Sequence, residues 1–232
     1  MILRVFTLAL EPANPLQFSL PEFRSLLTKQ LAEYLAATPA EHPASHSIHR
    51  YPAVQCKQVR SELMVIGICQ GAPFLHQLAS GNDTIPAGGS TCTIISRDAD
   101  IRNEEFGTGS ATHDYEFLTP WLALNQQYTK KFYDLNGKPA RDAFMEKLLL
   151  THLNTLAKSL DAPPAEPVTC TAHVKFKRER IDHENVIVFL GKFRTNLRIP
   201  DYFAIGQSVS QGYGTIRGIV PAPVPDIPGD GV

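Results

Sequence analysis

The order of strand-like and helix-like segments in the first half of the chain constrains its fold more than any other feature. Four mainly apolar runs with strand character are separated by two helical stretches, in the order 2–10 (strand), 23–35 (helix), 51–57 (strand), 63–69 (strand), 72–79 (helix) and 91–95 (strand). A plausible capping box, Ser19 to Glu22, precedes the first helix. This β-α-β-β-α-β order is the pattern of a ferredoxin-like split βαβ sandwich. A further strand at residues 112–118 is expected to extend the same sheet.

The second half repeats this plan in a reduced form. Apolar residues from Met145 to Leu160 follow helical spacing, and strands are expected at residues 168–180, 185–198 and 215–220. The predicted fold class is therefore α+β, with tandem ferredoxin-like (RRM-like) domains and a C-terminal Gly-rich loop. The predicted boundaries are residues 1–118 for the first domain, 119–220 for the second and 221–232 for a Pro-rich tail.

Composition is that of an ordinary globular protein. Hydrophobic residues make up 43% and charged residues 19% of the sequence, and no window approaches the roughly 18 uninterrupted apolar residues of a membrane span. The apolar N-terminus contains Arg4 and soon meets Pro12, so it is typical of a first strand rather than a signal peptide. The cysteines lack CxxC spacing and lie in apolar runs, which predicts buried thiols in a reducing compartment; they are Cys56, Cys69, Cys92 and Cys170. We therefore expect a cytoplasmic protein with no membrane partner.

Charge is distributed unevenly along the chain. The net charge of −1 argues against an indiscriminate nucleic-acid binder. Residues 168–220 nevertheless hold eight Lys and Arg against four acidic residues, so any anion-binding face is expected there. The cations that we predict to contact a polyanion are Lys175, Lys177, Arg178, Lys192, Arg194 and Arg198.

A Gly-rich loop at residues 206–214 follows these basic strands. Glycine reaches positive φ without steric cost, so such a loop can bring backbone N–H groups up to a phosphate. The loop residues that we predict to contact a polyanion are Gly206, Gln207, Gln211, Gly212 and Gly214. The alternative is a Gly-rich turn that only completes a sheet.

Three phrases of the sequence together resemble one protein family. They are YPAVQCK at residues 51–57, FLTPWLALN at 117–125 and IPDYFAIGQSVSQGYGTI at 199–216. They are similar to the CRISPR precursor-RNA processing endoribonucleases, the sixth of the numbered CRISPR-associated families, and most closely to its subtype b. The resemblance implies tandem ferredoxin-like domains, a C-terminal Gly-rich loop that faces RNA, and metal-independent cleavage within repeat RNA.

The chain departs from the family pattern in the Gly-rich loop. Members of the family generally carry Lys or Arg there, whereas this chain has Gln207 and Gln211. Ala204 also replaces the first glycine of the paired pattern. Because neutral donors bind phosphate less strongly than charged ones, the substitution favours weaker RNA binding.

Three histidines precede the second predicted strand, in the region where the resembling family places its catalytic histidines. They are His42, His46 and His49. Histidine can serve as acid and base near neutral pH, because its ordinary pKa is about 6.5. We predict His46 and His49 as the acid/base pair, in either assignment, with Tyr51 as a positioning residue. Arg50, Lys57 or the basic strands could then supply a cation to the phosphate.

Other interpretations of these histidines stay open at the level of sequence. They can be solvated loop residues without a role. Their spacings of four and three also suit a zinc site on one helix face, but Pro43 disfavours a helix, and no Cys or carboxylate stands at a suitable position. We therefore expect no metal and no cofactor. His152, within the predicted helix of the second half, is typical of a structural histidine.

Two functions from different classes follow. The first is a metal-independent endoribonuclease that cleaves CRISPR precursor repeat RNA and leaves a 2′,3′-cyclic phosphate. The second is a catalytically silent RNA-binding or scaffolding protein of the same fold, which the uncharged loop favours. The expected partners are CRISPR repeat RNA, CRISPR interference-complex proteins and a second copy of the chain.

Overall fold

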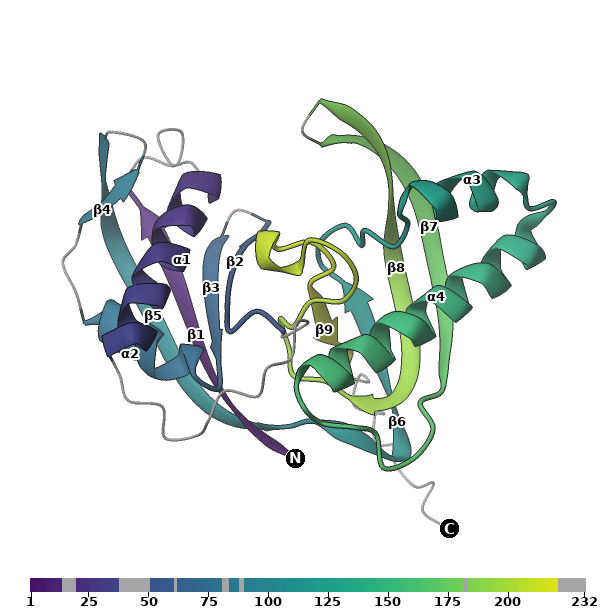
Figure 1. Cartoon of the computed structure of the whole chain (residues 1–232), viewed down its shortest axis with the longest axis horizontal. Coiled ribbons are helices and arrows are strands. Elements are labelled where there is room, and N and C mark those ends of the chain that lie inside the picture. The colour runs from purple at the N-terminus through teal and green to yellow at the C-terminus, as the bar shows by residue number, and fades with distance from the viewer. Residues whose placement is uncertain are drawn as a thin grey trace, which may run out of the picture.

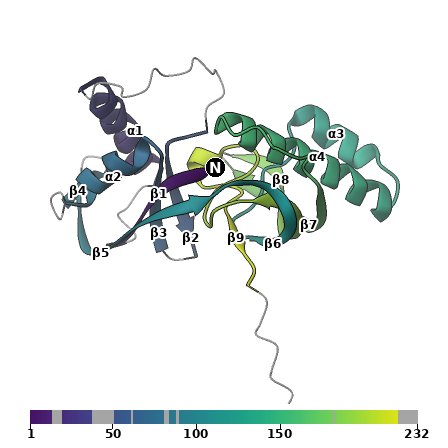
Figure 2. The same cartoon turned by 90° about the horizontal axis from the view of Figure 1, so that it is seen from below.

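Two β-sheets lie side by side in the computed structural model, each with helices on one face (Figure 1). Figure 2 shows both helical layers on the same side of the molecule. The structure describes residues 1–13, 20–37, 51–60, 62–80, 84–87, 90–181 and 183–220.

The N-terminal sheet has the strand order β2-β3-β1-β5-β4. Its elements are β1 (Ile2–Pro12), α1 (Leu20–Ala37), β2 (Val54–Val59), β3 (Glu62–Ile68), α2 (Gly71–Ala79), β4 (Thr84–Ala87) and β5 (Ser90–Glu105). Strand β3 lies between β1 and β2 and is antiparallel to both, which is the split βαβ arrangement predicted from the sequence. The short β4, expected as part of a turn, pairs with the start of β5.

The C-terminal sheet has the order β7-β8-β6-β9. Its elements are β6 (Gly107–Phe117), α3 (Gln126–Asp134), α4 (Lys138–Ser159), β7 (Cys170–Ile181), β8 (Glu184–Arg198), a 3₁₀ turn η2 (Val209–Gln211) and β9 (Ile216–Gly218). The order matches that of the first sheet, with the Gly-rich loop in place of a second helix before the last strand. The reduced second module is therefore confirmed.

Strand β6 corrects the expected domain boundary. The sequence interpretation added the strand at residues 112–118 to the first sheet, but β6 pairs with β8 and β9. The two sheets therefore divide at Phe106 rather than at residue 118. The physical reason is that β6 pairs with segments far along the chain, for example Glu116 with Lys192 and Tyr115 with Gly218. Local periodicity carries no information about such partners.

The two halves share a hydrophobic core. Leu3, Ile66 and Ile68 from the first sheet belong to the same buried cluster as Trp121, Leu149 and Phe193 from the second half. The other face of the first sheet packs against α1 and α2 in a separate cluster that includes Phe6, Phe23 and Leu75. Because the first sheet is covered on both faces, β3 is buried at six consecutive positions, and the halves form one packed body.

The described cysteines differ in burial. Cys56 is buried, as expected, whereas Cys69 is exposed at the end of β3 and Cys170 is partly buried; all three are free thiols. The expectation of buried thiols is therefore wrong for Cys69, which lies at a turn with positive φ rather than inside the strand.

No helix in the described ranges is long and apolar enough to span a membrane. The Pro-rich tail lies outside the described residues.

Candidate nucleic-acid interface

Tyr51 ties the chain that leads into β2 to the C-terminal half. Its backbone N–H donates to the Ser159 carbonyl at the end of α4 (3.1 Å). Its hydroxyl donates to the Ala204 carbonyl (3.0 Å) and accepts from the Ala204 N–H (2.7 Å), and its ring stacks on Phe203 with centroids 5.5 Å apart. Burial raises the pKa of the phenol well above its ordinary range. Tyr51 thus keeps its phenol proton and anchors the start of β2 to the C-terminal half. The predicted catalytic residues His46 and His49 lie outside the described residues.

The Gly-rich loop uses four of its backbone amides within the protein. The N–H of Gln207 donates to the Leu122 carbonyl (3.0 Å) and that of Gly214 to the Pro120 carbonyl (2.8 Å). The amides of Gln211 and Gly212 close the 3₁₀ turn on Ser208 and Val209. These four N–H groups already have acceptors, so the phosphate cradle expected from the loop is not formed by them. The Gln207 side chain is exposed, and that of Gln211 is partly buried.

The loop glycines allow close packing between protein segments. Gly214 has φ of +67°, and a β-carbon there would lie 2.0 Å from the Ile205 carbonyl oxygen. Gly212 has φ of +86°, and a β-carbon there would lie 3.0 Å from the backbone of Cys56 and Lys57 in β2. Gly206 lies against the Trp121 indole. The glycines therefore hold the loop against the rest of the protein, and we call its contact with Tyr51 and β2 the seam.

Lys57 is a buried member of this seam. Its side chain is 0% exposed, and its Nζ donates to Thr215 Oγ1 at 3.4 Å. Thr215 and Thr119 in turn donate to the Gly212 carbonyl, at 2.8 and 2.6 Å. Burial lowers the pKa of Lys57 to about 7. The suggestion that Lys57 offers a cation to phosphate is wrong for this buried position.

Four of the predicted cations share one exposed face of the C-terminal sheet. Residues paired directly across antiparallel strands point to the same side, and successive residues alternate. Phe176 and Phe189 are paired and contact Phe132 of α3, so their neighbours along each strand point away from the helices. We define the cationic face by the side chains on that opposite side: Lys175, Lys177, Lys192 and Arg194.

The cations of this face differ in their partners. Arg194 forms a two-pronged ion pair with Asp114 of β6, at 2.8 and 2.7 Å, and Lys177 pairs with Glu179. Lys175 and Lys192 form no ion pair with any residue that the structure describes. These two lysines are therefore the cations of the face that phosphate can reach without displacing a carboxylate.

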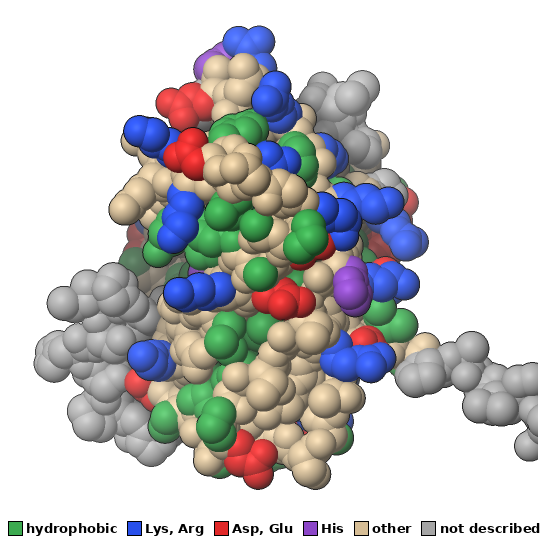
Figure 3. Space-filling view, turned by 90° about the vertical axis from the view of Figure 1, so that its right-hand side faces the viewer, with side chains coloured by type: hydrophobic (Ala, Val, Ile, Leu, Met, Phe, Trp, Pro, Cys, Tyr) green, Lys and Arg blue, Asp and Glu red, His purple; other side chains and the backbone are tan. Residues whose placement is uncertain are grey.

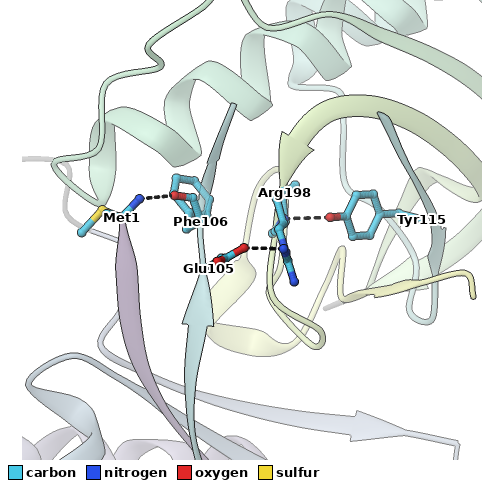
Figure 4. A network of polar contacts seen from close by, with 6 residues as sticks. Met1, Glu105, Phe106, Tyr115 and Arg198 are labelled. Carbon is cyan, nitrogen blue, oxygen red and sulfur yellow. Dashed lines mark hydrogen bonds and ion pairs between the residues drawn. The ribbon is translucent and has the colours of Figure 1, made fainter. Parts of the chain in front are cut away.

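Arg178 and Arg198 lie elsewhere. Arg178 is on the helix side of β7, where its guanidinium contacts the ring and hydroxyl of Tyr133. Arg198 pairs with Glu105 at the junction between the sheets (Figure 4). In the same view, the Met1 amino group donates to the Phe106 carbonyl (2.6 Å). The six predicted cations thus divide into a group of four and two separate positions.

The helical side carries exposed cations that the sequence interpretation missed. Figure 3 shows Lys and Arg side chains spread from the tip of the β7–β8 hairpin at the top across the helical end of the molecule, with acidic side chains between them. Helix α3 contributes the exposed Lys130 and Lys131 beside the exposed aromatic residues Tyr128 and Tyr133. The signal that could have predicted α3 was Asn125, whose side chain caps the helix by accepting from the Tyr128 N–H at 2.8 Å.

Within the described ranges, no group of three or more His, Cys, Asp and Glu side chains could hold a metal ion. The three histidines at 42, 46 and 49 lie outside those ranges.

Comparison with solved structures defines the class of protein. A crystal structure of Cas6b has a TM-score of 0.76 at 23% identity, covering 94% of this chain and 100% of that chain. A CRISPR RNA processing endoribonuclease Cas6b has 0.71 at 22% identity, with the same coverage. Csf5, a CRISPR-Cas type IV Cas6 crRNA endonuclease, has 0.51 at 11% identity, covering 95% of this chain and 100% of that chain. The fold is that of Cas6-type tandem ferredoxin-like proteins.

The sequence comparisons name the family. A model of the Cas6b N-terminal domain matches residues 1–105, and one of the Cas6b C-terminal domain matches residues 107–219. The chain therefore belongs to the Cas6b family. A curated relative, the uncharacterized protein MJ0978 of Methanocaldococcus jannaschii, is 28% identical over an alignment of 137 residues that covers 55% of this chain and 87% of the relative.

Proposed function

We propose that this protein is a metal-independent endoribonuclease that cuts CRISPR precursor repeat RNA, with His46 and His49 as general acid and base. The observation that carries the proposal is the anchoring of Tyr51 to Ala204, Phe203 and Ser159 in a chain of the Cas6b family. His49 precedes Tyr51 by two residues in the sequence, so the proposal assigns the chemistry to the region beside the seam. A solved relative is a CRISPR RNA processing endoribonuclease, which supports the same activity here.

The proposed reaction needs one proton acceptor and one proton donor. The base histidine takes the proton of a ribose 2′-hydroxyl, whose oxygen attacks the adjacent phosphorus. The bond from phosphorus to the 5′-oxygen breaks, and the acid histidine gives that oxygen a proton. The products are a 2′,3′-cyclic phosphate and a 5′-hydroxyl. Tyr51 positions the histidine segment and transfers no proton, because both hydrogen-bonding functions of its hydroxyl are occupied.

The cationic face supplies the electrostatic part of RNA binding in this proposal. Lys175 and Lys192 hold the RNA backbone, because they are exposed and unpaired among the described residues. An exposed sheet face is also where RRM-type domains bind single-stranded RNA. The free thiols fit a reducing cytoplasm.

Cleavage of the cognate repeat RNA in EDTA tests the activity. The wild-type protein is expected to leave a cyclic phosphate, and His46→Ala or His49→Ala to lower the rate at least about a hundredfold. His76→Ala, at an exposed histidine of α2, is the matched control and keeps the rate. RNA left intact by the wild-type protein over a broad pH range would remove the enzymatic proposal.

A specific observation favours the second candidate, a catalytically silent RNA-binding or scaffolding protein. The Gly-rich loop has glutamines in place of cations, and four of its amides donate to protein carbonyls. Salt-dependent RNA binding without cleavage is the result expected from it. We also predict a homodimer and contacts with CRISPR interference-complex proteins, which light scattering and co-purification would test.

A further inference from the structure

A pocket of about 280 Å³ opens beside Tyr51, between α4 and the Gly-rich loop. One wall is a single face of α4, where His152, Thr155 and Ser159 recur at helical spacing. The other wall is formed by loop residues, among them Gly206 and Val209. Within the described ranges no Lys, Arg, Asp or Glu lines the pocket. A phosphate group is therefore a poor occupant.

The polar groups of the α4 wall have defined hydrogen-bonding roles. His152 Nδ1 accepts from the Trp121 indole N–H at 3.2 Å, so in the neutral ring the proton is on Nε2. Burial lowers the pKa of His152 to about 4, which keeps the ring neutral at physiological pH. Nε2–H donates to no residue that the structure describes. It is thus a donor available to an occupant of the pocket.

The two hydroxyl groups of this wall complement that donor. Thr155 Oγ1 donates to the Thr151 carbonyl and Ser159 Oγ to the Leu156 carbonyl, both at 2.8 Å. Their protons are committed to the helix, so toward an occupant these hydroxyl groups can act only as acceptors. The pocket therefore combines apolar surface, one neutral donor and two acceptors, which suits a flat, uncharged molecule with a polar edge.

We propose that this pocket holds one nucleobase of the RNA, in the nucleotide that borders the cleaved phosphate. A nucleobase has apolar faces and an edge with both donors and acceptors, and RNA-binding proteins read unstacked bases in this way. The position next to the cut follows from Tyr51, which lines the pocket and is two residues from His49. The inference rests on the proposed function and adds a site that selects the nucleotide at the cut.

A pair of matched threonines on α4 allows a sharp test. Thr151 and Thr155 are both exposed and both donate to the carbonyl four residues earlier, but only Thr155 lines the pocket. Thr155→Leu narrows the pocket and removes one of its acceptors, and Thr151→Leu is the control. The probe is fluorescent repeat RNA, intact or with a single abasic nucleotide at each position in turn, and the measurement is its dissociation constant at fixed salt.

We expect Thr155→Leu to weaken binding of intact RNA about tenfold, which is within the range for loss of one base contact. The RNA whose abasic nucleotide lies beside the cut should bind the wild-type protein about tenfold more weakly than intact RNA does. The same abasic RNA should bind Thr155→Leu with the affinity that it has for the wild type, because the contact is already lost. Such non-additivity identifies the base that occupies the pocket. Thr151→Leu should bind every RNA like the wild type.

The outcomes separate this inference from the proposed function. RNA bound and cut normally by Thr155→Leu, or a loss of affinity that is the same for every abasic RNA, overturns the nucleobase pocket and leaves the endoribonuclease intact. Absence of RNA binding by the wild-type protein overturns both. His152→Asn is a second variant: the Asn oxygen can still accept from Trp121, but the Nε2–H donor is lost. It should reproduce the loss of affinity with native thermal stability.

Discussion

The Gly-rich loop and the cationic face are both RNA-binding candidates in the sequence, and they differ in how they use their polar groups. The loop directs four of its amides to protein carbonyls, and two of its glycines are buried. The face directs Lys175 and Lys192 into solvent. A glycine pattern is the same whether the close neighbour is a phosphate or a protein backbone. Only the neighbour decides which function the glycine serves.

The comparison extends to the two kinds of lysine. Lys57 lies in the seam, fully buried, with its pKa lowered to about 7. Lys192 lies on an open sheet face. Residue type alone makes both candidates for phosphate binding, but desolvation favours the neutral form of the buried one. The seam therefore holds the two halves of the protein together, whereas the cationic face presents positive charge to solvent.

The largest effect is expected from a β-carbon in the loop. Gly214→Ala should lower the free energy of unfolding by about 4 kcal/mol, because the new atom would collide with the Ile205 carbonyl and φ is positive. Gly109→Ala, at an exposed strand glycine with no atom within 4 Å of the new carbon, should leave it nearly unchanged. Urea denaturation measures both. If Gly214→Ala keeps the wild-type free energy of unfolding but binds RNA more weakly, the loop contacts RNA directly and the structural interpretation of its glycines is wrong.

Lys57 should make stability depend on pH. The native lysine has a pKa of about 7, against an unfolded value near 10.4. Between these values the unfolded chain holds one more proton than the native protein, so stability rises with pH. From pH 7 to 9 we expect the wild type to gain about 2 kcal/mol relative to Lys57→Met. Urea denaturation at each pH measures the free energy of unfolding of both proteins. If this free energy changes with pH in the same way in both, the lowered pKa of Lys57 is contradicted.

Removing the unpaired lysines should weaken RNA binding without changing stability. Lys175→Ala and Lys192→Ala are each expected to lower affinity about fivefold and to reduce the slope of log K against log salt by about 0.7. Lys138→Ala is the control for charge, because Lys138 is exposed at the start of α4 and pairs with Asp142. An equal loss in the control would mean that net charge, and not the cationic face, governs binding.

The smallest effect is expected at the Asp114–Arg194 pair. Arg194 holds the pKa of Asp114 below its ordinary value through two hydrogen bonds. Asp114→Asn removes the competing carboxylate and should raise RNA affinity about twofold at low salt. The gain should vanish in the Asp114→Asn, Arg194→Ala double variant. A loss of affinity in Asp114→Asn would show that the ion pair itself orients Arg194 for RNA.

Local sequence patterns predicted much of the fold. Helix α4 and strands β7 and β8 overlap the expected residues, although α4 begins earlier, at Lys138. The prediction succeeded because each pattern reflects which side of one element is buried. Helix α3 and the polar strand β5 were missed or shortened. β5 has few apolar residues after Ile95 and is held by its pairing along β1, which local periodicity does not report.

The candidate site was predicted less completely than the fold. The sequence interpretation selected the four residues of the cationic face, but grouped them with Arg178 and Arg198, which lie elsewhere. It assigned His152 a structural role, whereas the ring also lines the pocket beside Tyr51. The catalytic assignment of His46 and His49 stays a prediction, because these residues lie outside the described ranges.

The sequence by itself determined the two α+β modules, the family and the basic character of the second half, because helix and strand periodicity, motifs and charge are properties of short segments. The tertiary structure decided which sheet receives β6, that Lys57 is buried with a lowered pKa, and that α4 and the Gly-rich loop enclose a pocket at Tyr51. Each of these depends on contacts between segments far apart in the sequence, where pairing and desolvation are set by neighbours that no local pattern identifies.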